Sequence, residues 1–179
     1  MSRALSLAAL VVSTGLLAAC QTTGSVPAPP NATPPSASVF RPGDFSWSAV
    51  PGKGRIEGQL AYRGPEGGRY TCSGAGVVLT PETLWSRRRM TILYNSPDRA
   101  ALPADEVRAR TPSAPSGDYS AFVRRTTCDA NDRFSYTGLP NGAWFLITVA
   151  KPVAGTRGSD MAVMRRVEIR GGKSISVGL

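Results

Sequence analysis

From Ser46 onward, hydrophobic and polar residues alternate in short runs separated by turn residues. Ile56, Gly58, Leu60 and Tyr62 alternate with the polar residues Glu57 and Gln59, and this period of two predicts a strand with one buried face. Six further strands are predicted: 69–72 continuing at 77–79, 121–128, 133–136, 143–150, 162–169 and 174–179. Seven short strands separated by Gly, Pro, Asn and Asp residues indicate an all-β fold, with a β-sandwich as its architecture.

The run 143–150 differs from the others because it is apolar on both faces. Trp144 and Leu146 share one face, while Phe145 and Ile147 lie on the other. This pattern predicts a central strand, or a strand whose second face is covered by a helix.

One segment has a helical pattern. Thr80 and Pro81 resemble an N-cap followed by a first-turn proline. Trp85 and Leu93 then fall on one face at helical spacing. The sequence therefore predicts one short inserted helix over 81–94.

Four prolines interrupt the segment 95–118, which has no clear period. It is predicted to be a long irregular crossover. Loops of this length are uncommon in compact domains unless they are functional or mobile, so this crossover is also a hypothetical interaction site.

The N-terminus has the pattern of a secretory signal peptide. Arg3 precedes an apolar run from Ala4 to Ala19, which is too short to span a bilayer but suits an export signal. The run ends in Leu17-Ala18-Ala19-Cys20, which resembles a bacterial lipobox. We therefore expect residues 1–19 to be a lipoprotein signal peptide.

The lipobox resemblance implies that Cys20 is lipidated after cleavage and becomes the first residue of the mature protein. Two or three acyl chains anchor a protein durably, whereas one binds only marginally. Gln21 is not the Asp that resembles an inner-membrane retention signal, which favours the outer membrane. The alternative is an ordinary secreted protein in which Cys20 only lies near the cleavage site.

Residues 20–45 are rich in proline interleaved with Ser, Thr, Ala and Gly. Such a segment buries too little apolar surface to offset its ordering entropy. The sequence predicts a disordered, lipidated tether over 20–45 and a single β-sandwich domain over 46–179.

The positive net charge of the chain suggests that its partners are anionic. The chain has 21 Lys and Arg against 12 Asp and Glu, a net charge of +9, and removal of Arg3 with the leader leaves +8. An exported protein does not ordinarily meet nucleic acid, so the expected partners are an envelope protein or an anionic envelope polymer. The alternative is that the arginines only coat a solvated surface.

Catalytic chemistry is not indicated. The chain has no histidine, which removes the commonest general acid or base at neutral pH and the commonest metal ligand. No serine or cysteine lies in an activating motif, and no cofactor-binding motif is present. We expect no enzyme activity and no cofactor.

Once Cys20 is assigned to lipid, Cys72 and Cys128 remain as a pair in an oxidising compartment. They are predicted to form a disulfide. The rival interpretation, a redox-active cysteine, would require closely spaced partners or a histidine, which the sequence lacks.

Asp129, Asn131 and Asp132 supply oxygen atoms within one short segment. A calcium loop needs six to eight oxygen ligands and a different spacing. Turn formation explains these residues better, and no metal site is predicted.

The segment from Asp129 to Trp144 resembles the signature of carboxypeptidase regulatory-like domains, with its Asp-led turn, Phe-x-Tyr strand, Gly-Leu-Pro-x-Gly turn and following aromatic residue. Gly54-Arg55-Ile56-Glu57-Gly58 is similar to the first strand of that family. Ala75, Val77 and Leu79 are similar to its second.

This resemblance covers 54–179 and implies a seven-stranded transthyretin-like (prealbumin-like) sandwich, in which the helix and the crossover are insertions. Asp132 replaces the glycine usual in the family's turn, so a different turn conformation is expected there.

Three functional hypotheses follow. The first is a non-catalytic, lipid-anchored binding or structural module on the periplasmic face of the outer membrane. The second, by analogy of fold alone, is a docking lipoprotein of a secretion machine. The third is an enzyme or a carbohydrate- or peptidoglycan-binding module that uses Trp47, Trp85 or Trp144 as a stacking platform, although core packing is the commoner role of such residues.

Overall fold

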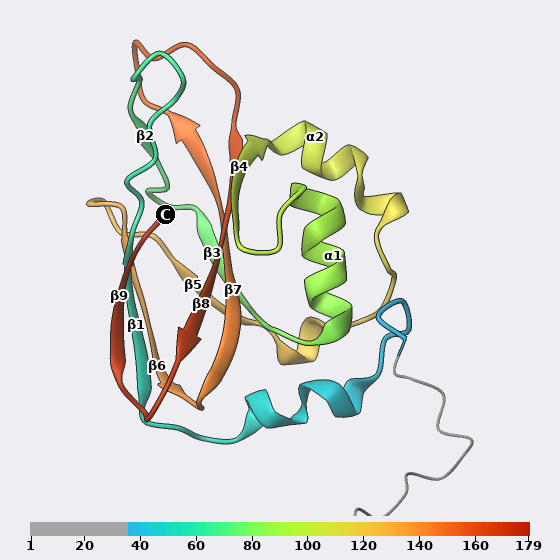
Figure 1. Ribbon diagram of the computed structural model, residues 1–179. Helices are drawn as coiled ribbons and strands as arrows, with labels where there is room; N and C mark the ends of the chain where they lie inside the picture. Colours follow the sequence, from blue (N-terminus) through green and yellow to red (C-terminus); the bar gives the residue numbers. More distant parts are fainter. Residues whose placement is uncertain (1–35) are drawn as a thin grey trace, which may run out of the picture. The chain divides into compact units, whose positions relative to one another are not determined.

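Two β-sheets face each other in the computed structural model, which describes residues 36–179 (Figure 1). The strands are β1 (Gly54–Gln59), β2 (Tyr70–Thr71), β3 (Gly76–Pro81), β4 (Arg99–Pro103), β5 (Arg124–Thr127), β6 (Arg133–Leu139), β7 (Gly142–Pro152), β8 (Met161–Ile169) and β9 (Ser174–Gly178). The helices are α1 (Leu84–Tyr94) and α2 (Ala104–Ala109), with three short 3-10 helices at Pro42–Ala49, Thr111–Ser113 and Ser120–Phe122.

The smaller sheet has the strand order β6-β1-β9. β1 runs antiparallel to β6 and parallel to β9, so Ile56 lies beside both Tyr136 and Ile175. Buried and exposed residues alternate strictly along β1, as its sequence predicts. One face of this sheet therefore lies on the core and the other faces solvent.

The larger sheet has the order β4-β8-β7-β3-β5, with β2 pairing to the far end of β7. Its central strand is β7, and both faces of β7 are covered. Trp144 and Leu146 belong to the cluster between the sheets, whereas Phe145 packs in a second cluster beneath α1 and α2. The two-faced pattern of 143–150 thus predicted the position of this strand correctly.

Both hydrophobic clusters lie within the compact unit Pro34–Leu179. This unit therefore contains a complete core of its own. Mostly β structure in two packed sheets confirms the all-β sandwich class.

Helix α1 begins later than predicted. Its N-cap is Thr83, not Thr80, and the hydroxyl of Thr83 accepts a hydrogen bond from the backbone N–H of Ser86. Ser86 in turn accepts from the N–H of Thr83, which completes a capping box. Thr80 and Pro81 instead extend β3, where Pro81 lies opposite Trp144.

The predicted irregular crossover contains regular structure. Residues Arg99–Pro103 form β4, which pairs with the edge of β8, and Ala104–Ala109 form α2. β4 has no alternating pattern of its own, and pairing to β8 stabilises it from outside the segment. Since β2 and β3 are also separate, the described residues contain nine strands instead of seven.

The folded domain starts before Ser46. Phe45 is fully buried, and its ring stacks on Phe122 with 5.0 Å between centroids. Phe40 packs edge-on against Trp85. The end of the segment predicted as tether is therefore part of the folded domain. Its two phenylalanines pack against aromatic residues of the domain, although prolines and a glycine lie between and beside them. The leader, Cys20 and the rest of the tether lie outside the described residues.

Within residues 36–179, none of the helices has the length and apolar character needed to cross a bilayer.

Candidate functional site

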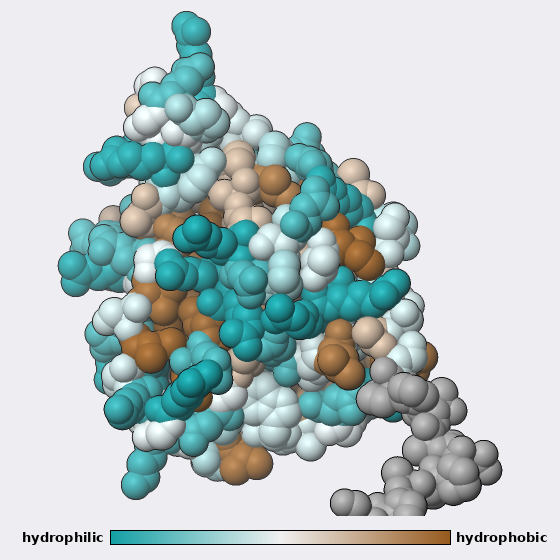
Figure 2. Space-filling view, viewed as in Figure 1, coloured by the Kyte–Doolittle hydropathy of each residue, from teal (hydrophilic) through white to brown (hydrophobic). Residues whose placement is uncertain are grey.

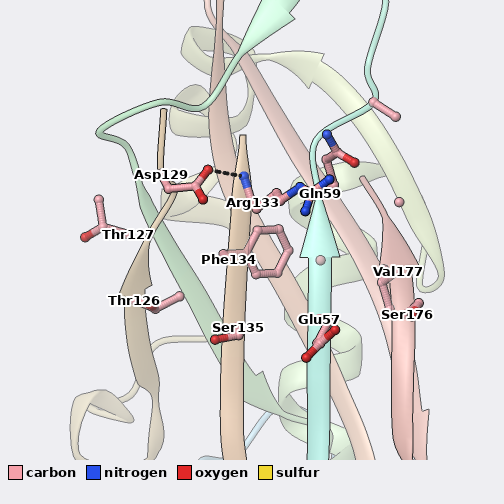
Figure 3. A pocket seen from close by; sticks show the side chains of 13 residues that line it. Glu57, Gln59, Thr126, Thr127, Asp129, Arg133, Phe134, Ser135, Ser176 and Val177 are labelled. Atoms are coloured by element: carbon pink, nitrogen blue, oxygen red, sulfur yellow. Dashed lines mark hydrogen bonds between the residues drawn. The ribbon is translucent and has the colours of Figure 1, made fainter. Parts of the chain in front are cut away.

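The solvent face of the smaller sheet forms a shallow hollow of about 700 Å³ (Figure 3). Side chains alternate along a strand, so every second residue of these strands reaches this face. Its polar side chains from this sheet are Glu57 and Gln59 of β1, Arg133 and Ser135 of β6, and Ser176 of β9. Thr126 and Thr127 of β5 and Asp129 of the following turn line its edge.

A second hollow of about 570 Å³ continues from the first and shares Gln59, Ala61 and Arg133 with it. Arg63, Arg69 and Asn131 add further polar groups at this end. We call the two hollows together the polar groove.

Most carboxylates along the polar groove already have partners. Oδ1 of Asp129 accepts hydrogen bonds from the backbone N–H groups of Asn131 and Arg133, each at 2.8 Å. Glu57 forms an ion pair with Arg55 at 2.8 Å. By contrast, the guanidinium of Arg133 makes no ion pair within the described residues, so its donors remain available to a ligand.

The segment 129–132 is a turn, as its spacing favours. Asp132 has a left-handed backbone, with φ of +62°, a conformation that Asp tolerates better than most residues. Its Oδ1 accepts hydrogen bonds from the N–H groups of Cys72 and Ser73. Within 36–179, no three His, Cys, Asp or Glu side chains gather in an arrangement that could hold a metal ion.

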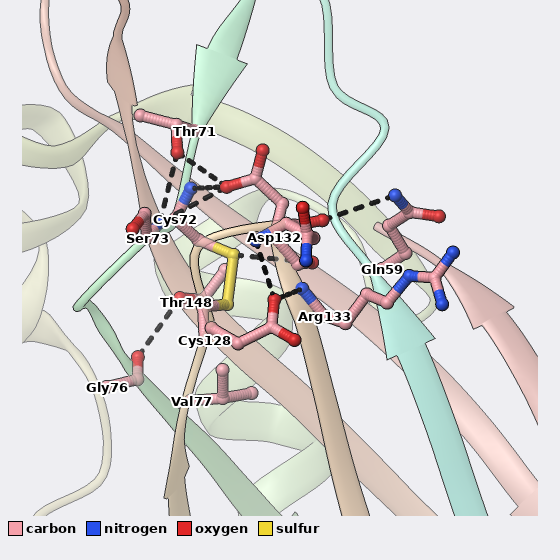
Figure 4. Close-up of a disulfide and its surroundings, with 12 residues drawn as sticks. Gln59, Thr71, Cys72, Ser73, Gly76, Val77, Cys128, Asp132, Arg133 and Thr148 are labelled. Atoms are coloured by element: carbon pink, nitrogen blue, oxygen red, sulfur yellow. Dashed lines mark hydrogen bonds between the residues drawn. A yellow bond between two sulfur atoms is a disulfide. The ribbon is translucent and has the colours of Figure 1, made fainter.

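Cys72 and Cys128 form the predicted disulfide, with an S–S distance of 2.05 Å (Figure 4). Both residues are buried, at 1% and 3% exposure. Cys72 lies in the connection between β2 and β3, and Cys128 lies between the end of β5 and the turn that leads into β6. The bridge therefore joins these two connections. Because the bridge is buried, we interpret it as a structural crosslink and not as a reactive disulfide.

The tryptophans belong to the core. Trp85 and Trp144 are 1% and 0% exposed, and Trp47 packs against Trp144 with 5.0 Å between ring centroids. A sugar cannot stack on the buried faces of Trp85 and Trp144. The hypothesis that Trp85 or Trp144 forms a carbohydrate platform is therefore wrong, and their core-packing interpretation is confirmed. Trp47 is only partly buried, and it packs against the cluster between the sheets.

The arginine clusters diverge instead of forming one patch. Arg87 and Arg166 share the carboxylate of Glu82, each at 2.6 Å. Arg89 lies over the rings of Trp85 and Tyr119. Figure 2 shows hydrophilic residues crossing the face that carries β8 and α1, with hydrophobic patches between them.

The strand pairs of arginines point to opposite faces, as predicted. Arg124 contacts the ring of Trp144 and donates to the carbonyl of Ser48, whereas Arg125 lies on the outer face. Arg165 likewise donates to the carbonyl of Gly178, on the opposite side from the Arg166–Glu82 pair.

Sequence reasoning did not single out the polar groove. Most of its residues come from β1, β6 and β9, which are far apart along the chain and become neighbours only through the order β6-β1-β9. The available signal was the polar half of the alternation, Glu57 and Gln59 on one strand and Arg133 and Ser135 on another, but it does not reveal which strands pair.

Neither a protein-family model nor a curated protein matches this chain. Among solved structures, the chain is similar to a Pseudomonas aeruginosa protein described as a proposed carbohydrate-binding protein. The TM-score is 0.57 at 21% sequence identity, and the match covers 78% of this chain and 97% of that one. At this identity the similarity establishes a shared fold.

Proposed function

We propose that this chain is a non-catalytic binding module of the bacterial envelope, held at the outer membrane by lipid on Cys20, and that it binds an envelope saccharide in the polar groove. The observation that carries the proposal is the gathering of Gln59, Arg133 and Ser176 on one solvent-exposed sheet face. The resemblance to transthyretin-like domains suits a protein that binds a partner instead of catalysing a reaction.

Saccharides present closely spaced hydroxyl groups that both donate and accept hydrogen bonds. The polar groove offers matching groups, because Arg133 donates, the amide of Gln59 does both, and the hydroxyls of Ser135 and Ser176 do both. Its two continuous hollows suit an extended chain of sugar units better than a single compact molecule. The description of the structurally similar Pseudomonas protein supports the same class of ligand.

Arg133 lies where the two hollows meet and is the best residue to test. We expect Arg133→Met to weaken saccharide binding about tenfold or more, since a hydrogen bond from a charged group contributes about 1.5–3 kcal/mol. Arg108→Met is the matched control, because Arg108 is exposed on α2 and lies outside the groove.

The measurement is isothermal titration of the unit Pro34–Leu179 with soluble peptidoglycan fragments and with the oligosaccharide part of lipopolysaccharide. Binding that Arg133→Met weakens and Arg108→Met leaves unchanged would support the proposal. If neither saccharide binds, or both variants bind alike, the groove is not the site.

The anchor is tested separately. Mass spectrometry of the chain exported by its bacterial host should find acyl chains on Cys20 and no residues 1–19. Cys20→Ser should move the protein out of the membrane fraction. An unmodified thiol on a chain that retains its leader would contradict the anchoring part of the proposal. It would not affect the part that concerns saccharide binding in the groove.

A further inference from the structure

The sandwich has an open side, where β9 is the edge strand of the smaller sheet and β4 the edge strand of the larger one. A hollow of about 360 Å³ lies there, between the end of β9 and the strand pair β4–β8. Figure 2 shows hydrophobic surface between β9 and β8, which lie side by side in Figure 1. We call this hollow the edge groove. Its apolar lining includes Tyr62, Ala101, Val163 and Leu179.

The edge groove is open to solvent. Among its lining residues, Arg99 and Arg165 are exposed, and Tyr62 and Leu179 are partly exposed. Val163 is buried, at 4% exposure, and lies at the base of the groove. A ligand can therefore contact the two arginines and the apolar sides without displacing the core.

Two arginines lie opposite each other across the pair β4–β8. Arg99 on β4 is the direct partner of Arg165 on β8, which places their Cβ atoms about 4.5–5.5 Å apart. Two residues further along β4, Ala101 is the partner of Val163, and both contribute to the cluster between the sheets. Because side chains alternate along a strand, the two arginines extend from this same inward face at its open side.

This arginine pair has no anionic partner in the part of the chain that the structure describes. No carboxylate there, that of Leu179 included, lies within ion-pair distance of either guanidinium. Arg165 donates one hydrogen bond of 2.6 Å to the carbonyl of Gly178, which leaves most of its five donors for a ligand. Like charges directly opposite each other destabilise a sheet, so an anion bound between Arg99 and Arg165 would offset their repulsion.

We propose that the edge groove binds the phosphomonoester head and the apolar chain of an anionic lipid. A phosphomonoester carries a charge of about −1.5 to −2 at neutral pH, which matches two guanidinium groups better than the single charge of a carboxylate does. Arginine also binds phosphate oxygens through paired hydrogen bonds. In this arrangement the phosphate lies between Arg99 and Arg165.

The apolar chain then lies along Ala101 and Leu179. The groove volume of about 360 Å³ is near the lower end of the range for ligand sites, about 300–1,000 Å³, so we expect one chain to bind and not several. This ligand differs in chemistry from the saccharide proposed for the polar groove. Arg99 and Arg165 line neither hollow of that groove.

Leucine methyl resonances offer a direct test, because Leu179 lines the edge groove and Leu84, an exposed leucine on α1, does not. The unit Pro34–Leu179, labelled with ¹³C on the leucine methyl groups, is titrated with octyl phosphate at concentrations below micelle formation. We expect a saturable shift of the Leu179 methyls while those of Leu84 stay in place. Equal shifts at both residues would mean nonspecific adsorption of the alkyl chain and would overturn the proposal.

Related ligands separate the contributions of the head and the chain. Octanoate, with one negative charge, should bind at least about fivefold more weakly than octyl phosphate, and octyltrimethylammonium should not bind. Glycerol 3-phosphate has the phosphate without the chain and should also bind more weakly. If it binds as tightly as octyl phosphate, the site takes a water-soluble phosphate ester and the lipid proposal is wrong.

Variants test the arginine pair itself. Arg99→Gln and Arg165→Gln each remove one charge at an exposed position, and each should weaken octyl phosphate at least about fivefold. Arg108→Gln, which changes an exposed residue of α2 outside the groove, should have no effect. Thermal unfolding of Arg99→Gln without ligand should show no loss of stability, because the substitution relieves repulsion. If both groove variants bind octyl phosphate like the wild type, the proposal fails.

The edge groove can be tested independently of the polar groove and of lipid on Cys20. Arg133→Met should leave octyl phosphate binding unchanged, and Arg99→Gln should leave saccharide binding unchanged. Absence of a Leu179 shift at about 5 mM octyl phosphate, where a Kd of about 1 mM would give near-saturation, would overturn this inference. The saccharide proposal would not be affected by that result.

Discussion

The backbone N–H of Cys72 donates a hydrogen bond of 2.8 Å to Oδ1 of Asp132, a residue 60 positions later in the chain. The same oxygen accepts from the hydroxyl of Thr71 and the N–H of Ser73. Asp132 follows the other half of the disulfide, Cys128, by only four residues (Figure 4). One carboxylate therefore links the turn after Cys128 to the backbone around Cys72.

Asp132→Ala should destabilise the domain by about 2–3 kcal/mol. It removes the shared acceptor and places an alanine in the left-handed region, which costs about 1 kcal/mol. Urea unfolding followed by tryptophan fluorescence measures the change. Asp132→Asn is the control, because asparagine tolerates this backbone and retains an acceptor oxygen; an equal loss in both variants would contradict the argument.

Loss of the disulfide should destabilise the domain further. Replacing both Cys72 and Cys128 with alanine should cost about 4 kcal/mol, the chain-entropy value for a loop of this length. The unfolding free energies of the variant and the wild type give the difference. A reducing agent should lower the wild type to the level of the variant and leave the variant unchanged; a wild type that keeps its full stability after complete reduction would disprove this role.

Phe45→Ala should destabilise the domain by about 3 kcal/mol or more, the usual cost of truncating a buried phenylalanine. Phe45 is fully buried, whereas Val39 in the same segment is 51% exposed. Val39→Ala should therefore change stability by less than about 0.5 kcal/mol. Thermal unfolding compares the two, and similar small effects would mean that the segment before Ser46 does not contribute to the core.

The stability of the domain should fall in acid because Glu82 becomes protonated. Burial acts to raise the pKa of this carboxyl, but its hydrogen bonds and ion pairs with Arg166 and Arg87 outweigh burial, so the pKa lies below its ordinary value of 4.5. A lowered pKa in the folded state contributes stability above the unfolded pKa and loses it as pH falls through the folded pKa.

We therefore expect the stability advantage of the wild type over Glu82→Gln to be constant from pH 7 down to about 5 and to shrink below about 4.5. Unfolding in urea across this pH range measures the advantage. Glu66→Gln serves as the control, since Glu66 is an exposed turn residue with no ion pair within the described residues. If the Glu82→Gln difference is the same at pH 7 and pH 3.5, the ion pairs do not act as described.

Local patterns alone predicted much of the fold. The period of two along β1, the two apolar faces of β7 and the turn around Asp129 are properties of neighbouring residues. Cys72 and Cys128 are the two cysteines that remain once Cys20 is assigned to lipid, so their pairing could be predicted, and the structure confirms it.

Contacts between distant segments decided the rest. β4 exists because the edge of β8 pairs with it, and Thr80 belongs to β3 because β7 extends alongside it. Phe45 is buried because Trp85 and Phe122 are near, which no window around Phe45 reveals. The polar groove requires β9, from the end of the chain, to lie beside β1. A sequence determines which side chains alternate along each strand, whereas only packing determines which strands become neighbours, because pairing energy comes from residues far apart in the chain.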